Sequence, residues 1–334
     1  MIKNSILAGL FLGMLAVSCK QSAIFYGISQ EVEPVEPRID GMPTNIVEFG
    51  GKVYAASRFS GNIQQYQNGS WSNLSYPGGK ILELAATTTH LYVLRGDPGS
   101  ATVSQYDGSN WATLSVSGNI QVIYGAGDYV FACVMTGNNT FDIYKSDGST
   151  VTCIKTGGKL LTGAALSGTE YYLATAGDGI VDDSYGARYS SGGNLTGIIA
   201  VDDKVLGVTR GGSVIYGSGT SFTSFSGGVA FTGGLGLWTS NGKDLLLLGT
   251  QGSSGSTVHG YQEIVLTSGA LGDMTLHSPG THENSSVQNA DKYNSSLRRH
   301  PVIGFLQAPD GILFAATVKN GLWAYRNNVW NAEE

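Results

Sequence analysis

Charged residues are scarce in this chain: 19 Lys and Arg and 25 Asp and Glu make up only 13% of its 334 residues. The basic residues are scattered, and the formal net charge is −6. The sequence therefore lacks the basic stripe with which proteins neutralise nucleic-acid phosphates. We expect no nucleic-acid partner.

Proline and cysteine are also few, with 8 and 3 residues, whereas glycine reaches 49. Beyond the first twenty residues, no segment shows convincing apolar spacing of three and four residues, which an amphipathic helix would require. Glycine and asparagine supply positive φ angles for tight turns at little steric cost. This composition predicts an all-β domain of many short strands.

Several catalytic motifs are missing. The sequence contains no Gly-x-Ser-x-Gly elbow, no His-Glu-x-x-His zinc motif and no glycine-rich phosphate loop. We therefore expect no enzymatic activity, no cofactor and no bound metal. Paired carboxylates for glycoside hydrolysis could still come from distant parts of the chain, so a carbohydrate-active or carbohydrate-binding protein stays an alternative.

The chain begins with a leader. A lysine precedes the apolar run Ile6–Val17, which is too short to cross a bilayer comfortably and has the size of a signal h-region. Leu15–Ser18 then lead into Cys19 as in a bacterial lipobox, although Ala16 stands where leucine is commonest. We predict a lipoprotein signal peptide over residues 1–18 and lipidation of Cys19, whose acyl chains would hold the protein at a membrane. An ordinary secretory signal or an uncleaved anchor is the alternative.

Residues 19–43 are expected to form a lipidated tether. Gln30–Pro37 is acidic and rich in proline, a composition that favours an extended chain. The short apolar patch Ala23–Tyr26 could instead pair with the edge of the following domain.

The remainder, residues 44–334, repeats itself with a period of about 40 residues. The first repeat contains four short strand candidates: Ile46–Phe49, Lys52–Ser57, Asn62–Tyr66 and Trp71–Leu74. An Asn-Gly or Asp-Gly pair precedes the fourth strand in several repeats and suits a type I′ hairpin. About seven such units can be aligned, and six or eight remain possible because the fourth and sixth are irregular.

A four-stranded sheet by itself exposes two apolar faces, so neighbouring sheets must stack to bury them. The repeat therefore predicts a single β-propeller of about seven four-stranded blades. A β-helix or two stacked sandwiches are the competing folds. Trp71, Trp111 and Trp330 recur just after the hairpin turn, where packing between blades is the expected role.

The two remaining cysteines, Cys133 and Cys153, fall on the second and fourth strands of one predicted blade. Two strand spacings amount to about 9.5 Å, which is beyond the reach of a disulfide. We expect no disulfide and predict that both thiols are buried as small hydrophobic side chains.

Consecutive connections in such a blade lie on opposite faces of the ring. The connections between first and second and between third and fourth strands are short. The other connections vary and lengthen, at Arg95–Ala101, Gly177–Ala187, Thr250–Thr257 and His277–His300. Binding residues concentrate on long loops over a rigid scaffold. The long-loop face, around the axial opening, is therefore the predicted functional surface.

Two groups on these loops form the candidate binding residues. Arg95, Gly96 and Asp97 make an Arg-Gly-Asp tripeptide, for which integrin-type recognition and an ordinary charged turn are the two interpretations. Asp178, Asp182 and Asp183 could bind Ca²⁺ or form a solvated acidic turn. The insertion His277–His300 holds histidines and carboxylates without the spacing of a rigid metal site, so a flexible loop is the preferred interpretation.

The leader with its cysteine, the segment Phe25–Glu31 and the opening repeat Asn45–Ala56 resemble propeller-type surface lipoproteins of spirochaetes, specifically treponemal paralogues. The resemblance extends over most of the chain. Some members of that group are regarded as adhesins for host extracellular matrix such as fibronectin. It implies a lipid-anchored protein of the outer membrane, exposed at the cell surface. No binding motif of the family can be transferred residue by residue.

These observations together predict a membrane-anchored, extracytoplasmic binding protein, with a surface adhesin as the leading hypothesis. A periplasmic scaffold for envelope assembly is the second hypothesis, since such scaffolds include propellers. A carbohydrate-binding or carbohydrate-active propeller is the third.

Overall fold

A computed structural model describes residues 39, 41–190, 193–240, 242–251, 260–267, 270–271, 297, 300–326 and 329–333. The predicted signal peptide, Cys19 and most of the predicted tether lie outside these residues. So do most of Thr250–Thr257 and of His277–His300. The described residues contain no helix long and apolar enough to span a bilayer.

The strands of the described residues form seven four-stranded antiparallel sheets, each built from four consecutive strands. Blades 1 to 4 comprise β1 (Val47–Phe49), β2 (Lys52–Ala56), β3 (Ile63–Gln67), β4 (Ser70–Leu74); β5 (Ile81–Ala86), β6 (Leu91–Arg95), β7 (Thr102–Tyr106), β8 (Trp111–Leu114); β9 (Asn119–Ala126), β10 (Tyr129–Gly137), β11 (Thr140–Ser146), β12 (Val151–Gly158); and β13 (Leu161–Ser167), β14 (Glu170–Thr175), β15 (Gly179–Asp182), β16 (Ala187–Tyr189). Blades 5 to 7 comprise β17 (Leu195–Val201), β18 (Lys204–Thr209), β19 (Ser213–Ser218), β20 (Ser221–Ser226); β21 (Phe231–Ser240), β22 (Lys243–Thr250), β23 (Tyr261–Thr267), β24 (Ala270–Leu271); and β25 (Val302–Gln307), β26 (Leu313–Thr317), β27 (Leu322–Arg326), β28 (Val329–Ala332).

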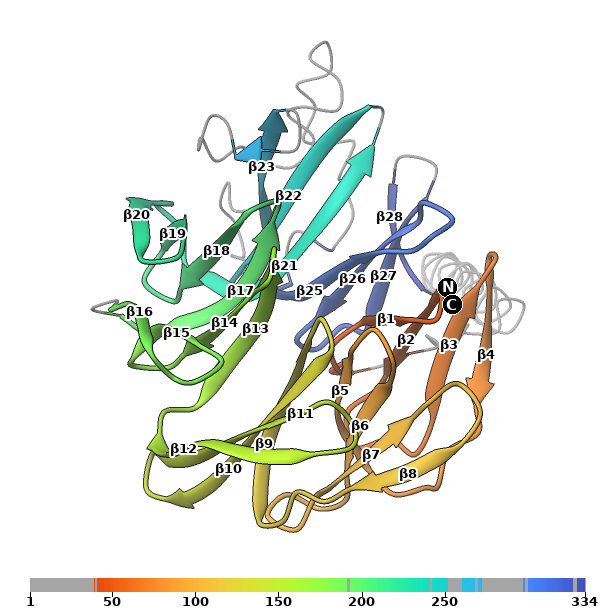
Figure 1. Ribbon diagram of the computed structural model, residues 1–334. Helices are drawn as coiled ribbons and strands as arrows, with labels where there is room; N and C mark the ends of the chain where they lie inside the picture. Colours follow the sequence, from red (N-terminus) through yellow and green to blue (C-terminus); the bar gives the residue numbers. More distant parts are fainter. Residues whose placement is uncertain are drawn as a thin grey trace, which may run out of the picture. The chain divides into compact units, whose positions relative to one another are not determined.

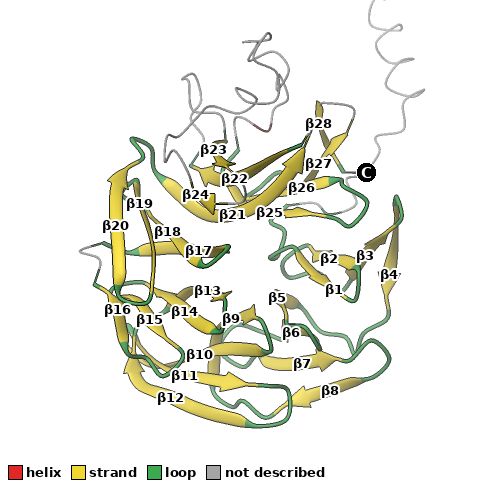
Figure 2. Cartoon of the chain, turned by 45° about the horizontal axis from the view of Figure 1, so that its top comes forward, coloured by secondary structure: helices red, strands yellow, loops and turns green. Residues whose placement is uncertain are grey.

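Figure 2 shows these sheets arranged in a ring, with the first strand of each blade nearest the centre and the fourth strand toward the outside. The fold is a seven-bladed β-propeller, as the repeat predicts. The number of blades is seven, and the β-helix and the stacked sandwiches are excluded.

The core consists of layers between neighbouring blades. Each of seven buried apolar clusters joins side chains from two adjacent blades. The second strands supply continuous buried runs such as Leu91–Leu94 and Leu245–Leu248. These runs do not alternate with polar residues, because a central strand has a neighbouring blade against each of its faces.

The repeated tryptophans lie in these layers, so their predicted role in packing between blades is confirmed. Trp71 of blade 1 packs against Phe314 of blade 7, with ring centroids 5.4 Å apart. Trp330 of blade 7 meets Tyr261 of blade 6 at 6.0 Å. Trp111 of blade 2 donates its indole N–H to the carbonyl of Ser75, which follows blade 1, at 2.9 Å.

The hairpin turns follow the predicted chemistry only in part. Asn68 and Gly69 have φ angles of 50° and 83°, as a type I′ turn requires. Asp107 and Asp147 instead begin longer loops, in which the carboxylate Oδ1 of each accepts two backbone N–H bonds from residues two and three positions on. These bonds hold the pKa of both carboxyl groups below the ordinary value.

Cys133 lies on β10 and Cys153 on β12, with β11 between them, and both thiols are free as predicted. Cys133 is buried, and burial raises the pKa of its thiol to about 12. The prediction that Cys153 is also buried is wrong. It is exposed because β12 is the outermost strand of blade 3.

The ring closes where blade 7 meets blade 1 (Figure 1, blue beside red and orange). No strand is shared between these blades, since each is built from consecutive strands. Part of the closure is backbone pairing. The N–H groups of Gly321 and Leu322 donate to the carbonyls of Gly41 and Ile39, at 2.8 and 3.2 Å. Both carbonyls lie within the stretch expected to be a tether.

Side chains complete the closure. The Tyr66 hydroxyl donates to Asp310 Oδ2 at 2.6 Å. The Trp71 indole N–H donates to Glu333 Oε1 at 2.7 Å, and Arg326 approaches the same oxygen at 2.7 Å. The first contact joins β3 to the β25–β26 connection, and the second joins β4 to Glu333, the last described residue of the chain. They hold together two blades that lie at opposite ends of the sequence.

Tyr66→Phe removes one bond of this closure without changing the packing of the ring. We expect the free energy of unfolding to fall by about 1 kcal/mol, the usual worth of such a hydrogen bond. Urea titration followed by tryptophan fluorescence measures the change. The control is Tyr216→Phe on β19, which we expect to shift the free energy by less than about 0.5 kcal/mol. Equal midpoints for the two variants would contradict a stabilising role for the Tyr66–Asp310 bond.

Candidate functional site

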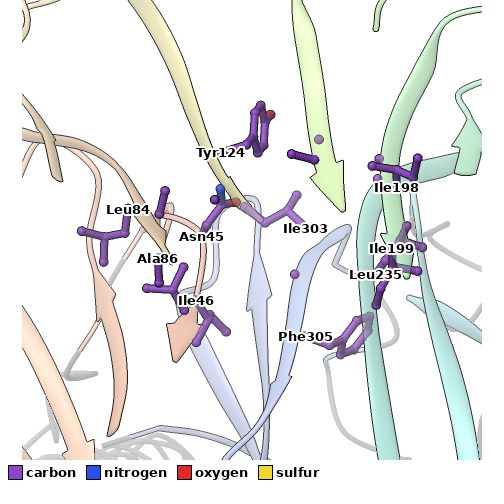
Figure 3. A pocket seen from close by; sticks show the side chains of 18 of the residues that line it. Asn45, Ile46, Leu84, Ala86, Tyr124, Ile198, Ile199, Leu235, Ile303 and Phe305 are labelled. Atoms are coloured by element: carbon purple, nitrogen blue, oxygen red, sulfur yellow. The ribbon is translucent and has the colours of Figure 1, made fainter. Parts of the chain in front are cut away.

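The seven innermost strands enclose an axial cavity of about 320 Å³. Every blade contributes to its wall (Figure 3). Most of the lining is apolar or is glycine backbone, from the following residues: Ile46, Val47, Leu84, Ala85, Ala86, Gly125, Gly163, Ala164, Gly197, Ile198, Ile199, Gly233, Leu235, Ile303, Gly304 and Phe305. The remaining lining residues are Asn45, Glu48, Tyr124 and Thr162.

A recurrent irregularity shapes the inner strands. In blades 2 to 7 the register between first and second strands shifts near the beginning of the first strand. Such a bulge bends the strand and increases its twist. Two residues after the last regular pair before the shift, blades 4, 5, 6 and 7 have Gly163, Gly197, Gly233 and Gly304.

Two of these glycines are needed because neighbouring backbones nearly touch. A Cβ on Gly197 would lie 2.3 Å from the Gly233 carbonyl oxygen, and a Cβ on Gly233 would lie 2.0 Å from the Thr196 carbonyl oxygen. Neither distance is possible for a real side chain. At Gly304, by contrast, an added Cβ would meet nothing within 4 Å. The inner strands of blades 5 and 6 therefore approach closely at this position, while the space beside Gly304 is open.

This glycine position was not predicted, although the sequence contains a signal for it. The triplet Leu-Thr-Gly occurs at residues 161–163 and again at 195–197, and Phe-Thr-Gly occurs at 231–233. A search for one residue type at a fixed place in each repeat would have found it. Asn45 and Tyr124 carry no comparable signal, because each occurs in one blade only.

Three polar residues from different blades line the cavity: Asn45 before β1, Tyr124 on β9 and Thr162 on β13. The Thr162 hydroxyl has no hydrogen-bond partner in the described part of the chain, but it is fully buried and therefore out of reach of a ligand in the cavity. The side chains of Asn45 and Tyr124 also form no hydrogen bond with any residue that the structure describes. Burial raises the pKa of Tyr124, so its hydroxyl stays protonated and remains a donor.

The charge around the cavity is low. Glu48 is the only formally charged lining residue, and it is exposed. Behind the wall, the buried Glu83 carboxylate pairs with Arg58 at 2.8 Å and accepts the Asn45 backbone N–H at 2.6 Å. Burial raises the pKa of Glu83, and the Arg58 charge opposes this rise. This pair fixes the backbone of Asn45, because the carboxylate holds its N–H.

Gly96 and Asp97 lie on the β6–β7 connection, as predicted, but Arg95 is the last residue of β6, and none of the three lines the cavity. Arg95 turns inward: its Nε donates to Ser104 Oγ at 2.6 Å and its Nη1 to the Gly78 carbonyl at 3.1 Å. Asp97 forms an exposed ion pair with Lys80 at 2.6 Å. Both charged groups are therefore engaged within the chain.

The prediction of a single loop over Gly177–Ala187 is wrong, because the strand β15 divides this segment into two connections. Asp178 lies on the β14–β15 connection, whereas Asp182 and Asp183 lie at the other end of β15, on the opposite face of the ring. Only four residues form this strand, which explains why the sequence reads as one loop. The three carboxylates have partners: Tyr185 for Asp178 at 3.0 Å, Arg188 for Asp182 at 3.3 Å and Lys145 for Asp183 at 2.5 Å. The described residues contain no group of three or more His, Cys, Asp or Glu arranged to hold a metal ion.

Comparison with known proteins finds no matching family model. No curated protein matches either. Solved structures with the same fold include streptogramin B lyase, which is 12% identical with a TM-score of 0.55 over 85% of this chain and 93% of that one. YCF48 bound to a D1 peptide is 11% identical, with a TM-score of 0.53 over 86% and 94%. The WD40 propeller domain of Doa1 is 11% identical, with a TM-score of 0.55 over 89% and 95%. At such low identity the likeness shows the fold alone.

The contrast between Gly197 and Gly304 gives a matched pair of variants. Gly197→Ala forces the backbones of blades 5 and 6 apart, so we expect the free energy of unfolding to fall by about 2 kcal/mol or more. Gly304→Ala meets no atom, and we expect a change within about 1 kcal/mol in either direction. Chemical denaturation of both variants beside the parent protein measures these values. Equal destabilisation by the two substitutions would show that the close approach at Gly197 does not limit the ring.

Proposed function

We propose that this protein is a lipid-anchored, extracytoplasmic binding protein without enzymatic activity, and that it acts as a surface adhesin for host extracellular matrix. Its ligand docks on the long-loop face of the ring and reaches the axial cavity. The observation that carries the binding role is the presence of Asn45 and Tyr124, whose side chains have unused hydrogen-bonding groups, in a largely apolar cavity. Apolar walls with a few convergent polar groups are typical of ligand sites.

The architecture supports recognition of a protein ligand. The connections between second and third strands extend from a rigid ring, and one of them presents Phe59 with 57% of its surface exposed. Exposed aromatic side chains often become the residues that contribute most to a protein interface. YCF48, a propeller of similar fold, is known in a structure with a bound D1 peptide.

The anchor rests on sequence alone. The leader, the lipobox ending at Cys19 and the following proline-rich segment indicate lipidation and a tether. The resemblance to treponemal surface lipoproteins supports a place in the outer membrane and a matrix ligand such as fibronectin. The long-loop face would then be free to meet the ligand.

Cys19→Ser tests the anchor. We expect loss of the acyl chains and transfer of the protein from the detergent phase to the aqueous phase in a Triton X-114 partition, because no thiol remains to be acylated. Mass spectrometry of the N-terminal peptide checks the modification. Cys153→Ser, at an exposed thiol elsewhere in the chain, is the control and should leave the partition unchanged. Detergent-phase behaviour of the Cys19→Ser protein would refute lipidation at this residue.

Binding of the purified chain lacking its signal peptide to immobilised fibronectin tests the adhesin role. Surface plasmon resonance should show saturable binding, and Phe59→Ser should weaken it at least tenfold if this aromatic anchors the contact. Leu237→Ser, at a 43% exposed apolar residue on β21, is the matched control. An absence of binding to matrix proteins, beside a positive control that binds, would remove the adhesin proposal.

Protease treatment of intact cells separates the surface location from the periplasmic alternative. A surface adhesin is degraded under conditions that spare a known periplasmic protein. Protection of the chain until the outer membrane is permeabilised would favour the envelope scaffold instead.

A further inference from the structure

We infer that the axial cavity receives an uncharged, partly apolar group that carries a carboxamide. This inference rests on the proposed binding role of the cavity and is independent of the adhesin role. It assigns to the cavity a chemical class of ligand, which the fold itself does not specify.

The hydrogen-bonding groups of the cavity are the first reason. The Asn45 side chain offers an acceptor oxygen and two donor hydrogens, and Tyr124 offers a donor. Neither side chain forms a hydrogen bond within the described part of the chain. A carboxamide also presents both a carbonyl oxygen and N–H groups. It can therefore pair with the Asn45 amide through two hydrogen bonds while its carbonyl accepts from a hydroxyl.

Charge is the second reason. No lysine or arginine lines the cavity, and its one carboxylate, Glu48, would repel an anion. A carboxylate or phosphate entering it would lose hydration without gaining a cation, which is costly. The Arg58 guanidinium behind the wall is already paired with Glu83. An uncharged polar group avoids this cost and still pairs with the two unused side chains, Asn45 and Tyr124.

Size and the apolar wall are the third reason. A volume of about 320 Å³ corresponds to about ten water molecules and lies at the small end of ligand cavities. Leu235, Ile303 and Phe305 form part of the wall (Figure 3). The cavity thus matches a group of the size of one or two amino-acid residues, with an apolar portion beside its amide. Such a group can be a free small molecule or the tip of a loop on a protein ligand.

A pair of matched probes tests the assigned chemistry. N-acetyl-4-fluorophenylalaninamide and N-acetyl-4-fluorophenylalanine differ only in the terminal group, which is a carboxamide in one and a carboxylate in the other. Binding to the complete chain is followed by broadening of the ¹⁹F resonance. We expect the amide to bind and the acid to bind at least tenfold more weakly. Equal binding of the two probes, or binding of neither, would overturn the inference.

Cavity variants locate the binding. Asn45→Leu and Tyr124→Phe should each weaken binding of the amide probe about three- to tenfold, the effect expected for one hydrogen bond. Asn62→Leu in an exposed loop and Tyr216→Phe on β19 are the matched controls and should bind as the parent does. Gly304→Ala adds a methyl group to the wall where space is open, so it tests the cavity without removing a polar group. Unchanged binding by all three cavity variants would overturn the inference.

The same variants separate this inference from the proposed function. If the amide probe binds through Asn45 and Tyr124 but fibronectin does not bind, the adhesin proposal fails and the assigned ligand chemistry stands. If fibronectin binds while the amide probe does not, the inference fails and the adhesin proposal stands. Competition of the amide probe with fibronectin would show that the group entering the cavity belongs to the protein ligand.

Discussion

Closure of the ring is the constraint on which the rest of the structure depends. Each blade buries its apolar faces only against two neighbours, so an open ring would expose one face of blade 1 and one of blade 7. A strand shared between the first and last blades would hold such a ring closed. In this protein, however, every blade uses four consecutive strands. The task falls instead to Ile39 and Gly41, and to the contacts of Tyr66 and Trp71 with the C-terminal part of the chain.

The cavity follows from the closed ring. Seven inner strands must converge around one axis, and the backbones of blades 5 and 6 approach so closely that glycine is required at Gly197 and Gly233. Asn45 and Tyr124 bring accessible polar groups to the wall from blades 1 and 3. Backbone contact shapes this part of the wall as well, because a Cβ on Gly125, next to Tyr124, would lie 1.8 Å from the Ala86 carbonyl oxygen. Glu83 and Arg58 fix the backbone of Asn45 beside blade 2, because the Glu83 carboxylate accepts the Asn45 N–H while it pairs with Arg58.

Much of the fold was predictable because turn pairs and tryptophans recur at fixed places in each repeat. A blade can be recognised from such local signals, and the predicted packing of Trp71, Trp111 and Trp330 is confirmed. The errors arose where local signals are weak. The four residues of β15 are too few to show alternation, so Asp178, Asp182 and Asp183 were placed on one loop. Cys153 was predicted buried although it was placed on the fourth strand of its blade, and the fourth strand lies at the outside of the ring.

The candidate site was harder to predict than the fold. Asn45, Tyr124 and Thr162 are far apart in sequence and belong to no motif, and only the geometry of the ring brings them together. Charged tripeptides and acidic clusters are conspicuous in a sequence, yet Arg95 and the three aspartates have partners within the chain. An ionic partner supplied by tertiary structure cannot be recognised from neighbouring residues alone.

Because no strand is shared between blades, the chain could begin at a different blade without loss of a sheet. Each blade is a contiguous segment of the chain. The position of the chain ends between blades 7 and 1 therefore does not affect how any sheet is formed. A circular permutant that begins at β5 and joins the old ends by a linker would keep all seven sheets intact. Its new break would fall in the exposed connection between β4 and β5, a kind of site where permutation is usually tolerated. The ring is thus modular with respect to its starting point, and its closure rests on backbone and side-chain contacts between blades 7 and 1 rather than on a shared strand.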